Sequence, residues 1–195
     1  MRELFKKYLE QGLSRRDFTN RMLGLGFSQI AVNSFLASAV EAREPIAENG
    51  KYIIGNGADI LAETLMAADV DYIFGTSATG MSGFFDALTM KNEMEFISSI
   101  AESQATSMAQ GYELITGKTA ILFLPGVAIP SAMNNLYNAW KDRSSIVVLS
   151  DGTSSNFSGR NGFQQMDDWL ETMTQFTKWR WKVTNPQQLS EMTRR

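Results

Sequence analysis

The chain has 195 residues and a net charge of −3, with 44% hydrophobic and 20% charged residues. This length and composition are typical of one globular core, and the absence of a Lys/Arg stripe argues against a nucleic-acid partner. Because the chain contains neither Cys nor His, disulfides, thiolate catalysis, a Ser-His-Asp hydrolase and a Cys- or His-ligated metal are excluded from its own residues. Any chemistry must rest on carboxylates, Lys, Tyr, amides or a cofactor.

The first part of the chain, residues 1–42, resembles an export signal. Positions 14–18 read Ser-Arg-Arg-Asp-Phe, which is similar to the twin-arginine motif. Residues 22–40 carry no charge but are only mildly apolar, and Ala-Ser-Ala at 37–39 is a small-x-small cleavage pattern. This order predicts twin-arginine export to the periplasm. The alternative is an amphipathic N-terminal helix of a cytoplasmic protein, with the two arginines in a solvated turn.

The pattern changes after this segment. Residues 43–56 contain Asn-Gly and Gly-Asn pairs and are interpreted as a linker to a domain at 57–195. In that domain, short apolar runs alternate with helical periodicity. We expect helices at 58–68, 81–88, 102–115 and 131–140, and strands at 72–74, 95–100, 119–124 and 146–149.

Apolar strands separated by amphipathic helices are typical of an α/β fold, in which helices cover both faces of a parallel sheet. Ligands bind such folds at the carboxyl ends of the strands. The candidate binding loops are therefore those at 75–80, 101–103, 125–131 and 151–162. The first lacks the spacing of a phosphate-binding glycine loop. Asp-Gly-Thr at 151–153 is interpreted as a turn after a strand.

A set of short phrases occurs in one order from about Tyr52 to the end of the chain. They are Gly-Ala-Asp-Ile-Leu at 57–61, Val-Asp-Tyr-Ile-Phe-Gly at 70–75, Phe-Phe-Asp-Ala-Leu at 84–88, Ala-Glu at 101–102, Met-Ala-Gln-Gly-Tyr at 108–112, Thr-Gly-Lys at 116–118, Asn-Ala-Trp-Lys-Asp-Arg at 138–143, Phe-Gln at 163–164 and Thr-Lys-Trp at 177–179. This set resembles the N-terminal, pyrimidine-binding domain of thiamine-diphosphate-dependent enzymes of the acetolactate synthase, pyruvate decarboxylase and benzoylformate decarboxylase type. The resemblance implies a parallel α/β domain that binds thiamine diphosphate.

The resemblance also assigns a catalytic and cofactor-binding role to Glu102. In the family, the matching Glu hydrogen-bonds the N1 nitrogen of the cofactor's pyrimidine, which favours the imino tautomer and so helps to form the nucleophilic ylide. General acid–base assistance of this kind contributes about 10²–10⁴-fold in rate. A carboxyl group shielded from water is suited to sharing its proton in this way. Taken alone, Glu102 would be interpreted as a helix N-terminal acid that interacts with the helix dipole, worth about 0.3–1 kcal/mol.

Five further positions are implied as site residues. Thr79 matches a loop that faces the substrate, Gly126 would let the backbone approach the cofactor closely, and Ala128 belongs to the same loop as Gly126. Phe163 and Gln164 match a segment near the active site. Thr79 has a plainer interpretation as a turn residue, and Phe163 and Gln164 as parts of an exposed loop.

The chain departs from the family pattern at several points. The position before Glu102, commonly His, is Ala101, and Leu124 matches an active-site His of some decarboxylases. The family's Gly-Asp-Gly motif and later Asn, which hold a metal ion and the diphosphate, have no counterpart here. We therefore expect the diphosphate-binding domain and the magnesium ligands to belong to a partner domain or subunit, within a homo- or hetero-oligomer.

The leading hypothesis is one domain or subunit of a thiamine-diphosphate-dependent lyase or carboligase acting on a 2-keto acid, with the cofactor supplying the carbanion chemistry. The alternative is a non-catalytic binding or scaffolding protein that keeps the fold and has lost the cofactor, which Ala101 and the missing diphosphate motif favour. A third interpretation, an unrelated doubly wound binding domain, requires the ordered phrases to be a coincidence.

Overall fold

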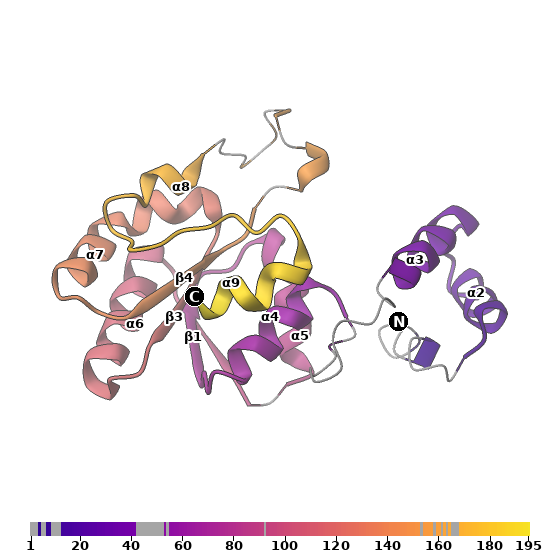
Figure 1. Ribbon diagram of the computed structural model, residues 1–195, viewed down its shortest axis with the longest axis horizontal. Coiled ribbons are helices and arrows are strands. Elements are labelled where there is room, and N and C mark those ends of the chain that lie inside the picture. Colours follow the sequence, from indigo (N-terminus) through magenta and orange to yellow (C-terminus); the bar gives the residue numbers. More distant parts are fainter. Residues whose placement is uncertain are drawn as a thin grey trace. The chain divides into compact units, whose positions relative to one another are not determined.

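The computed structural model describes all residues except 1–3, 5–6, 9–12, 42–52, 54, 92, 153, 158, 161, 163 and 165–167. The chain divides into two compact units, Met1–Asn56 and Gly57–Arg195. The second unit contains the sheet and every element expected to carry a binding loop (Figure 1).

The first unit contains two helices, α2 (Arg15–Gly24) and α3 (Gln29–Glu41). Ser14 caps α2: its hydroxyl accepts a hydrogen bond from the Asp17 backbone N–H at 3.1 Å and donates one to Asp17 Oδ2 at 2.6 Å. The helices share a small core, in which Tyr8 stacks on Phe18 with ring centroids 4.7 Å apart. The other buried side chains of this core are Met22, Val32 and Leu36.

The arginine pair of the export-like motif lies exposed in the first turn of α2. The Ala-Ser-Ala pattern at 37–39 falls within α3. Across the described residues, no helix is both long and apolar enough to cross a bilayer. Export and periplasmic location therefore stay predictions, as does the cytoplasmic alternative.

The second unit is built on a four-stranded sheet. Its strands are β1 (Tyr72–Gly75), β2 (Glu95–Ser98), β3 (Ala120–Leu124) and β4 (Ile146–Ser150), in the order β2-β1-β3-β4. Every neighbouring pair is parallel. All five residues of β3 are buried, because this strand has a neighbour on each edge and helices on each face. The predicted parallel sheet is thus confirmed.

Helices cover both faces of the sheet, also as predicted (Figure 1). Successive side chains of β3 point to opposite faces. Phe123 packs into the core beneath α4 (Gly57–Met66) and α5 (Ser82–Thr89), whereas Leu122 packs beneath α6 (Glu102–Thr116) and α7 (Ile129–Lys141). The predicted helix and strand boundaries agree with these elements to within two residues. Gly117 ends α6 in the left-handed conformation, with φ of 68°.

The segment after β4 holds short elements that no periodic pattern of apolar residues predicts. These are η3 (Ser155–Phe157), α8 (Trp169–Thr172), η4 (Pro186–Gln188) and α9 (Leu189–Arg194). Leu189 of α9 packs against the core on the α4 side, and Met173 is buried in the core on the α6 side. Helices of four to six residues are too short to display an amphipathic repeat, so only tertiary packing defines them.

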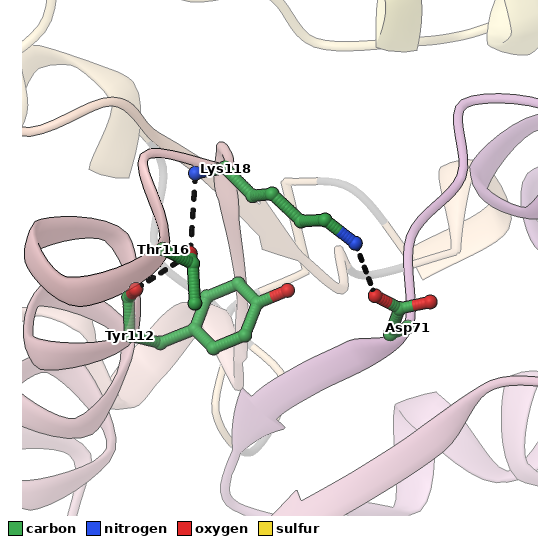
Figure 2. Close-up of polar contacts among 4 residues, drawn as sticks. All are labelled: Asp71, Tyr112, Thr116 and Lys118. Carbon is green, nitrogen blue, oxygen red and sulfur yellow. Dashed lines mark hydrogen bonds and ion pairs between the residues drawn. The ribbon is translucent and has the colours of Figure 1, made fainter.

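A polar cluster joins the end of α6 to the beginning of β1 (Figure 2). The Thr116 hydroxyl donates to the Tyr112 carbonyl at 2.7 Å and accepts from the Lys118 backbone N–H at 3.1 Å. The Lys118 ammonium then pairs with Asp71 Oδ2 at 2.6 Å. The Asp71 carboxylate, first by hydrogen bonding and then by its charge, raises the pKa of Lys118. This cluster lies at the amino ends of β1 and β3, opposite the expected binding edge.

We expect Lys118→Met to have a small, pH-dependent effect on stability, since both charges of the pair are about half exposed. The folded pKa of Lys118 is raised, so the contribution of the pair is fully present below the unfolded value of about 10.4 and is lost as the pH rises through the higher folded value. Urea unfolding of both proteins from neutral pH to pH 11 measures this difference. A difference in unfolding free energy that does not shrink at high pH, or that persists in the Asp71→Asn background, would contradict the assignment of the effect to the Lys118–Asp71 pair.

Candidate functional site

Glu102 is the first residue of α6 and follows β2 after a three-residue connection. Ala101 before it is extended, with φ of −147° and ψ of 145°, and gives the helix no side-chain cap. The Ser99 hydroxyl donates to the Ala101 carbonyl at 3.1 Å and so stabilises this connection. The Glu102 carboxylate therefore lies at the carboxyl edge of the sheet, beside a helix N-terminus that favours negative charge.

Loops from two other strands meet on this carboxylate. Thr76, directly after β1, donates its hydroxyl to Glu102 Oε1 at 3.0 Å. Ser131, in the first turn of α7 and hence beyond β3, donates to Glu102 Oε2 at 2.6 Å. Thr76 is buried, while Glu102 is half-buried and Ser131 is exposed. One carboxylate thus connects the loops that follow three adjacent strands.

Burial and hydrogen bonding act in opposite directions on the pKa of Glu102. Removal from water is the largest single effect and raises the pKa, because it penalises the charged form. The hydrogen bonds from Ser131, from the Glu102 backbone N–H and from Thr76 together outweigh it, so the pKa lies below the ordinary glutamate value. The carboxylate is therefore ionised at neutral pH in this chain, and it is less shielded from water than the sequence analysis expected.

Ser131→Ala is expected to raise the pKa of Glu102, because it removes the largest of the three hydrogen-bonding effects. Thr76→Val should raise it by less. A depressed pKa stabilises the folded state above the unfolded value of about 4.3, and this contribution is lost as the pH falls through the folded value. Carbon-13 NMR titration of the glutamate side chains measures the shift. Ser107→Ala is the control, because Ser107 lies on the same helix as Glu102 but is hydrogen-bonded to Asn135. A Glu102 pKa that Ser131→Ala leaves unchanged would contradict the assignment.

The loop predicted to contain Gly126 and Ala128 is a single 3-10 turn, η2 (Gly126–Ala128). Gly126 is buried, and its N–H donates to Asp151 Oδ1 at 2.8 Å. The Ala128 carbonyl accepts the Ser131 hydroxyl at 2.8 Å, so this loop is bonded to the residue that contacts Glu102. The Gly126 backbone closely approaches the protein's own Asp151, which does not test the predicted approach to a cofactor. A role for either residue in cofactor binding stays a prediction.

The remaining predicted site residues are placed less fully. Thr79 begins the 3-10 turn η1 (Thr79–Met81), which follows β1 at the same edge as Glu102. Gln164 is exposed and adopts a φ of 63°, the left-handed region that few residues other than glycine occupy. Phe163 lies outside the described residues. No contact joins Gln164 to the Glu102 cluster among the interactions of the described part of the chain.

Three residues of this site were not among the predicted site residues: Thr76, Ser131 and Asp151. The sequence analysis named their loops and interpreted Asp151 as a turn residue, but it assigned none of the three side chains to the site. The available signal was position, since each follows the end of a strand by one to seven residues in a parallel sheet.

Where the structure describes the chain, no three acidic side chains gather into a possible metal site. The expectation that a partner supplies the magnesium ligands is not tested by this.

A parallel α/β sheet whose loops meet on one ionised carboxylate defines a ligand-binding domain with a candidate acid–base centre. Residues 55–172 match the family described as thiamine pyrophosphate enzyme, N-terminal TPP binding domain. This match covers more than half of the chain, so the chain belongs to that family. The family resemblance read from the residues is confirmed, and the third interpretation, an unrelated doubly wound domain, falls away.

The curated relatives are larger proteins. The acetolactate synthase large subunit of Buchnera aphidicola subsp. Acyrthosiphon pisum (strain APS) is 30% identical over 113 residues, which are 57% of this chain and 20% of that protein. The sulfoacetaldehyde acetyltransferase of Alcaligenes xylosoxydans xylosoxydans is 27% identical over 141 residues, covering 71% of this chain and 23% of that protein. The chain thus spans about a fifth of the length of the curated relatives it matches.

Solved structures share the fold. The thiamine diphosphate-dependent 4-hydroxybenzoylformate decarboxylase of Rhodococcus jostii RHA1 superposes with a TM-score of 0.67 at 21% identity, over 71% of this chain and 26% of that one. The benzoylformate decarboxylase of Polynucleobacter necessarius gives a TM-score of 0.63 at 13% identity, over the same shares. These relatives are enzymes by name, so the comparisons do not favour the non-catalytic alternative.

Proposed function

We propose that this chain is the pyrimidine-binding part of a thiamine-diphosphate-dependent lyase or carboligase that acts on a 2-keto acid, and that Glu102 is its catalytic residue. The observation that carries the proposal is the Glu102 carboxylate, held by hydroxyls from two neighbouring loops at the carboxyl edge of a family-member fold. The choice of a 2-keto acid follows from the names of the related decarboxylases and acetolactate synthases.

The donors and acceptors around Glu102 suit such a ligand. An ionised carboxylate has about four lone-pair sites. Thr76 and Ser131 occupy one on each oxygen and the Glu102 backbone N–H takes a third, which leaves capacity for a donor from a bound ring. When bound, thiamine diphosphate supplies the carbanion chemistry of the reaction. Glu102 would contact its pyrimidine, with η1 and η2 as the neighbouring backbone.

The task of Glu102 is to hold or release a proton at a carboxylate oxygen. Its pKa reflects a balance in which burial already has the largest single effect, and burial raises the pKa. A ligand and a partner domain that covered the half-exposed carboxylate would increase this effect and bring the pKa closer to neutrality. A carboxyl group whose pKa lies nearer the working pH exchanges its proton more effectively with a weak base.

The proposal includes a partner. The related proteins are about five times as long as the matched segment. We assign the diphosphate and magnesium sites to a second domain or subunit, because the described part of this chain offers no oxygen-rich site for them. Titration calorimetry of thiamine diphosphate with magnesium, into this chain alone and into its mixture with a candidate diphosphate-binding domain, tests the assignment. We expect heat of binding in the mixture only, and weaker binding with Glu102→Gln.

Glu95→Gln is the matched control, because it removes the same charge from the exposed first residue of β2, at the opposite edge of the sheet. It should bind as the unsubstituted chain does. Equal weakening by both variants would assign the effect to net charge and not to Glu102. Absence of binding in a mixture of two folded proteins would reject the cofactor role and leave the scaffolding alternative.

A further inference from the structure

Asp151, the first residue after β4, places its carboxylate between two loops of the candidate site. Its Oδ1 accepts the Gly126 N–H at 2.8 Å, at the beginning of η2. Its Oδ2 lies against Gly80 of η1, where a Cβ atom would come within 1.9 Å of that oxygen. The carboxylate therefore touches one loop with each oxygen, and its half-buried side chain fills the space between them.

Both loops carry glycine where they meet Asp151, and the contacts leave no space for a side chain. A Cβ atom on Gly126 would lie 2.9 Å from the Asp151 carbonyl oxygen. Contacts below 3.0 Å are not tolerated by real Cβ atoms, and here the neighbour is backbone, which cannot move aside by a rotamer change. The Ser150 hydroxyl donates to the same carbonyl at 3.2 Å and stabilises its position. Asp151 is thus packed closely against both loops at their glycines.

Loop η2 connects this aspartate to Glu102. It ends at Ala128, whose carbonyl accepts the Ser131 hydroxyl at 2.8 Å, while the same hydroxyl is 2.6 Å from Glu102 Oε2. Because η2 runs directly into the first turn of α7, which carries Ser131, a displacement of η2 would move the Ser131 hydroxyl away from the Glu102 carboxylate.

We propose that Asp151 is a positioning residue that holds η1 and η2 together and, through η2, keeps Ser131 in place against Glu102. The inference rests on the proposed function for its catalytic meaning, because it concerns the residue assigned there as the acid–base group. Asp151 itself touches neither Glu102 nor Ser131 in any contact of the described residues, so its influence passes through η2. Its own negative charge at the same edge is a second, electrostatic influence of opposite sign.

These two influences can be separated by the sign of their effect on the pKa of Glu102. Asp151→Asn removes the charge but keeps the size and an acceptor for Gly126, so loss of a like charge should lower the pKa or leave it unchanged. Asp151→Ala removes the charge and also releases η2, and the weakened Ser131 hydrogen bond should raise the pKa. Asp151→Glu keeps the charge but is too long for the space, and should also raise it.

The experiment is a carbon-13 NMR titration of Glu102 in the three variants, together with hydrogen exchange of the Gly126 amide. The amide should exchange about tenfold faster in Asp151→Ala than in Asp151→Asn, as for the loss of one hydrogen bond. Asp142→Ala is the matched control, because it removes a carboxylate that accepts Gln110 at the other end of α7. This control should change neither the pKa of Glu102 nor the exchange rate of the Gly126 amide.

Two results would overturn the proposal. If Asp151→Ala and Asp151→Glu leave the pKa of Glu102 unchanged while the Gly126 amide loses its protection from hydrogen exchange, Asp151 stabilises η2 locally and has no influence on the site. If Asp151→Ala lowers the pKa as Asp151→Asn does, the influence is electrostatic alone. Should Asp151→Ala not fold, Asp151→Glu decides the question by itself. No cofactor is needed, so failure of thiamine diphosphate binding in the calorimetric experiment leaves this test intact.

Discussion

Replacing Glu102 with Gln is expected to lower turnover by the assembled enzyme about 10²–10⁴-fold, the usual contribution of one acid–base group. The amide matches the carboxylate in size and its oxygen can still accept one hydroxyl, from Thr76 or Ser131. Unlike a carboxylate, the amide cannot take up or release a proton. Steady-state kinetics on a set of 2-keto acids, with thiamine diphosphate, magnesium and the partner domain present, measures kcat and KM separately. The loss should fall on kcat.

The competing interpretation of Glu102, a helix N-terminal acid, predicts a different result. A favourable interaction with the helix dipole is worth about 0.3–1 kcal/mol of stability and has no effect on turnover once the protein is folded. Unfolding of Glu102→Gln in urea, measured beside its kinetics, therefore separates the two roles. Intact turnover with a small loss of stability would assign Glu102 to the helix. A large loss of turnover in Glu95→Gln as well would show that turnover depends on the net charge of the domain and not on the position of Glu102.

Much of the fold could be predicted because its elements have strong local signals. The apolar run at 120–124 is buried on both faces as the central strand β3, and Gly117 ends α6 in the conformation that glycine favours. Both signals lie within a few residues of the feature they predict. The segment after β4 has short helices without an amphipathic repeat, and its structure depends on distant contacts, such as that of Leu189 with the α4 side of the core.

The candidate site was predictable only in part, for a related reason. Glu102 could be named because the resemblance supplied its role, and the sheet topology placed its loop at the correct edge. Its partners could not, since Thr76 and Ser131 are 26 and 29 residues away in the sequence. Asp151 is 25 residues from Gly126 and looked like an ordinary turn residue. Hydroxyls and carboxylates are common in turns, so only the packed structure identifies which of them meet.

Gly75, the last residue of β1, should be the most sensitive position at this edge of the sheet. A Cβ atom there would lie 2.1 Å from the carbonyl oxygen of Phe123, its partner in β3, and 3.0 Å from the ring of Phe96. Glycine within a strand marks such a close backbone approach. We expect Gly75→Ala to lower the free energy of unfolding by about 3 kcal/mol, at the upper end of overpacking effects, because backbone atoms must separate to admit the methyl group.

The substitution should also affect the site, since Thr76 follows Gly75 directly and donates to Glu102. Gly111→Ala is the matched control: Gly111 lies inside α6, and a Cβ atom there meets nothing within 4 Å. Alanine favours the helix by about 0.5–1 kcal/mol, so this variant should gain stability. Urea unfolding of both variants measures the contrast. Gains of stability in both variants would show that backbone propensity alone decides the effect at Gly75, whereas opposite signs would locate the cause in the contact between β1 and β3.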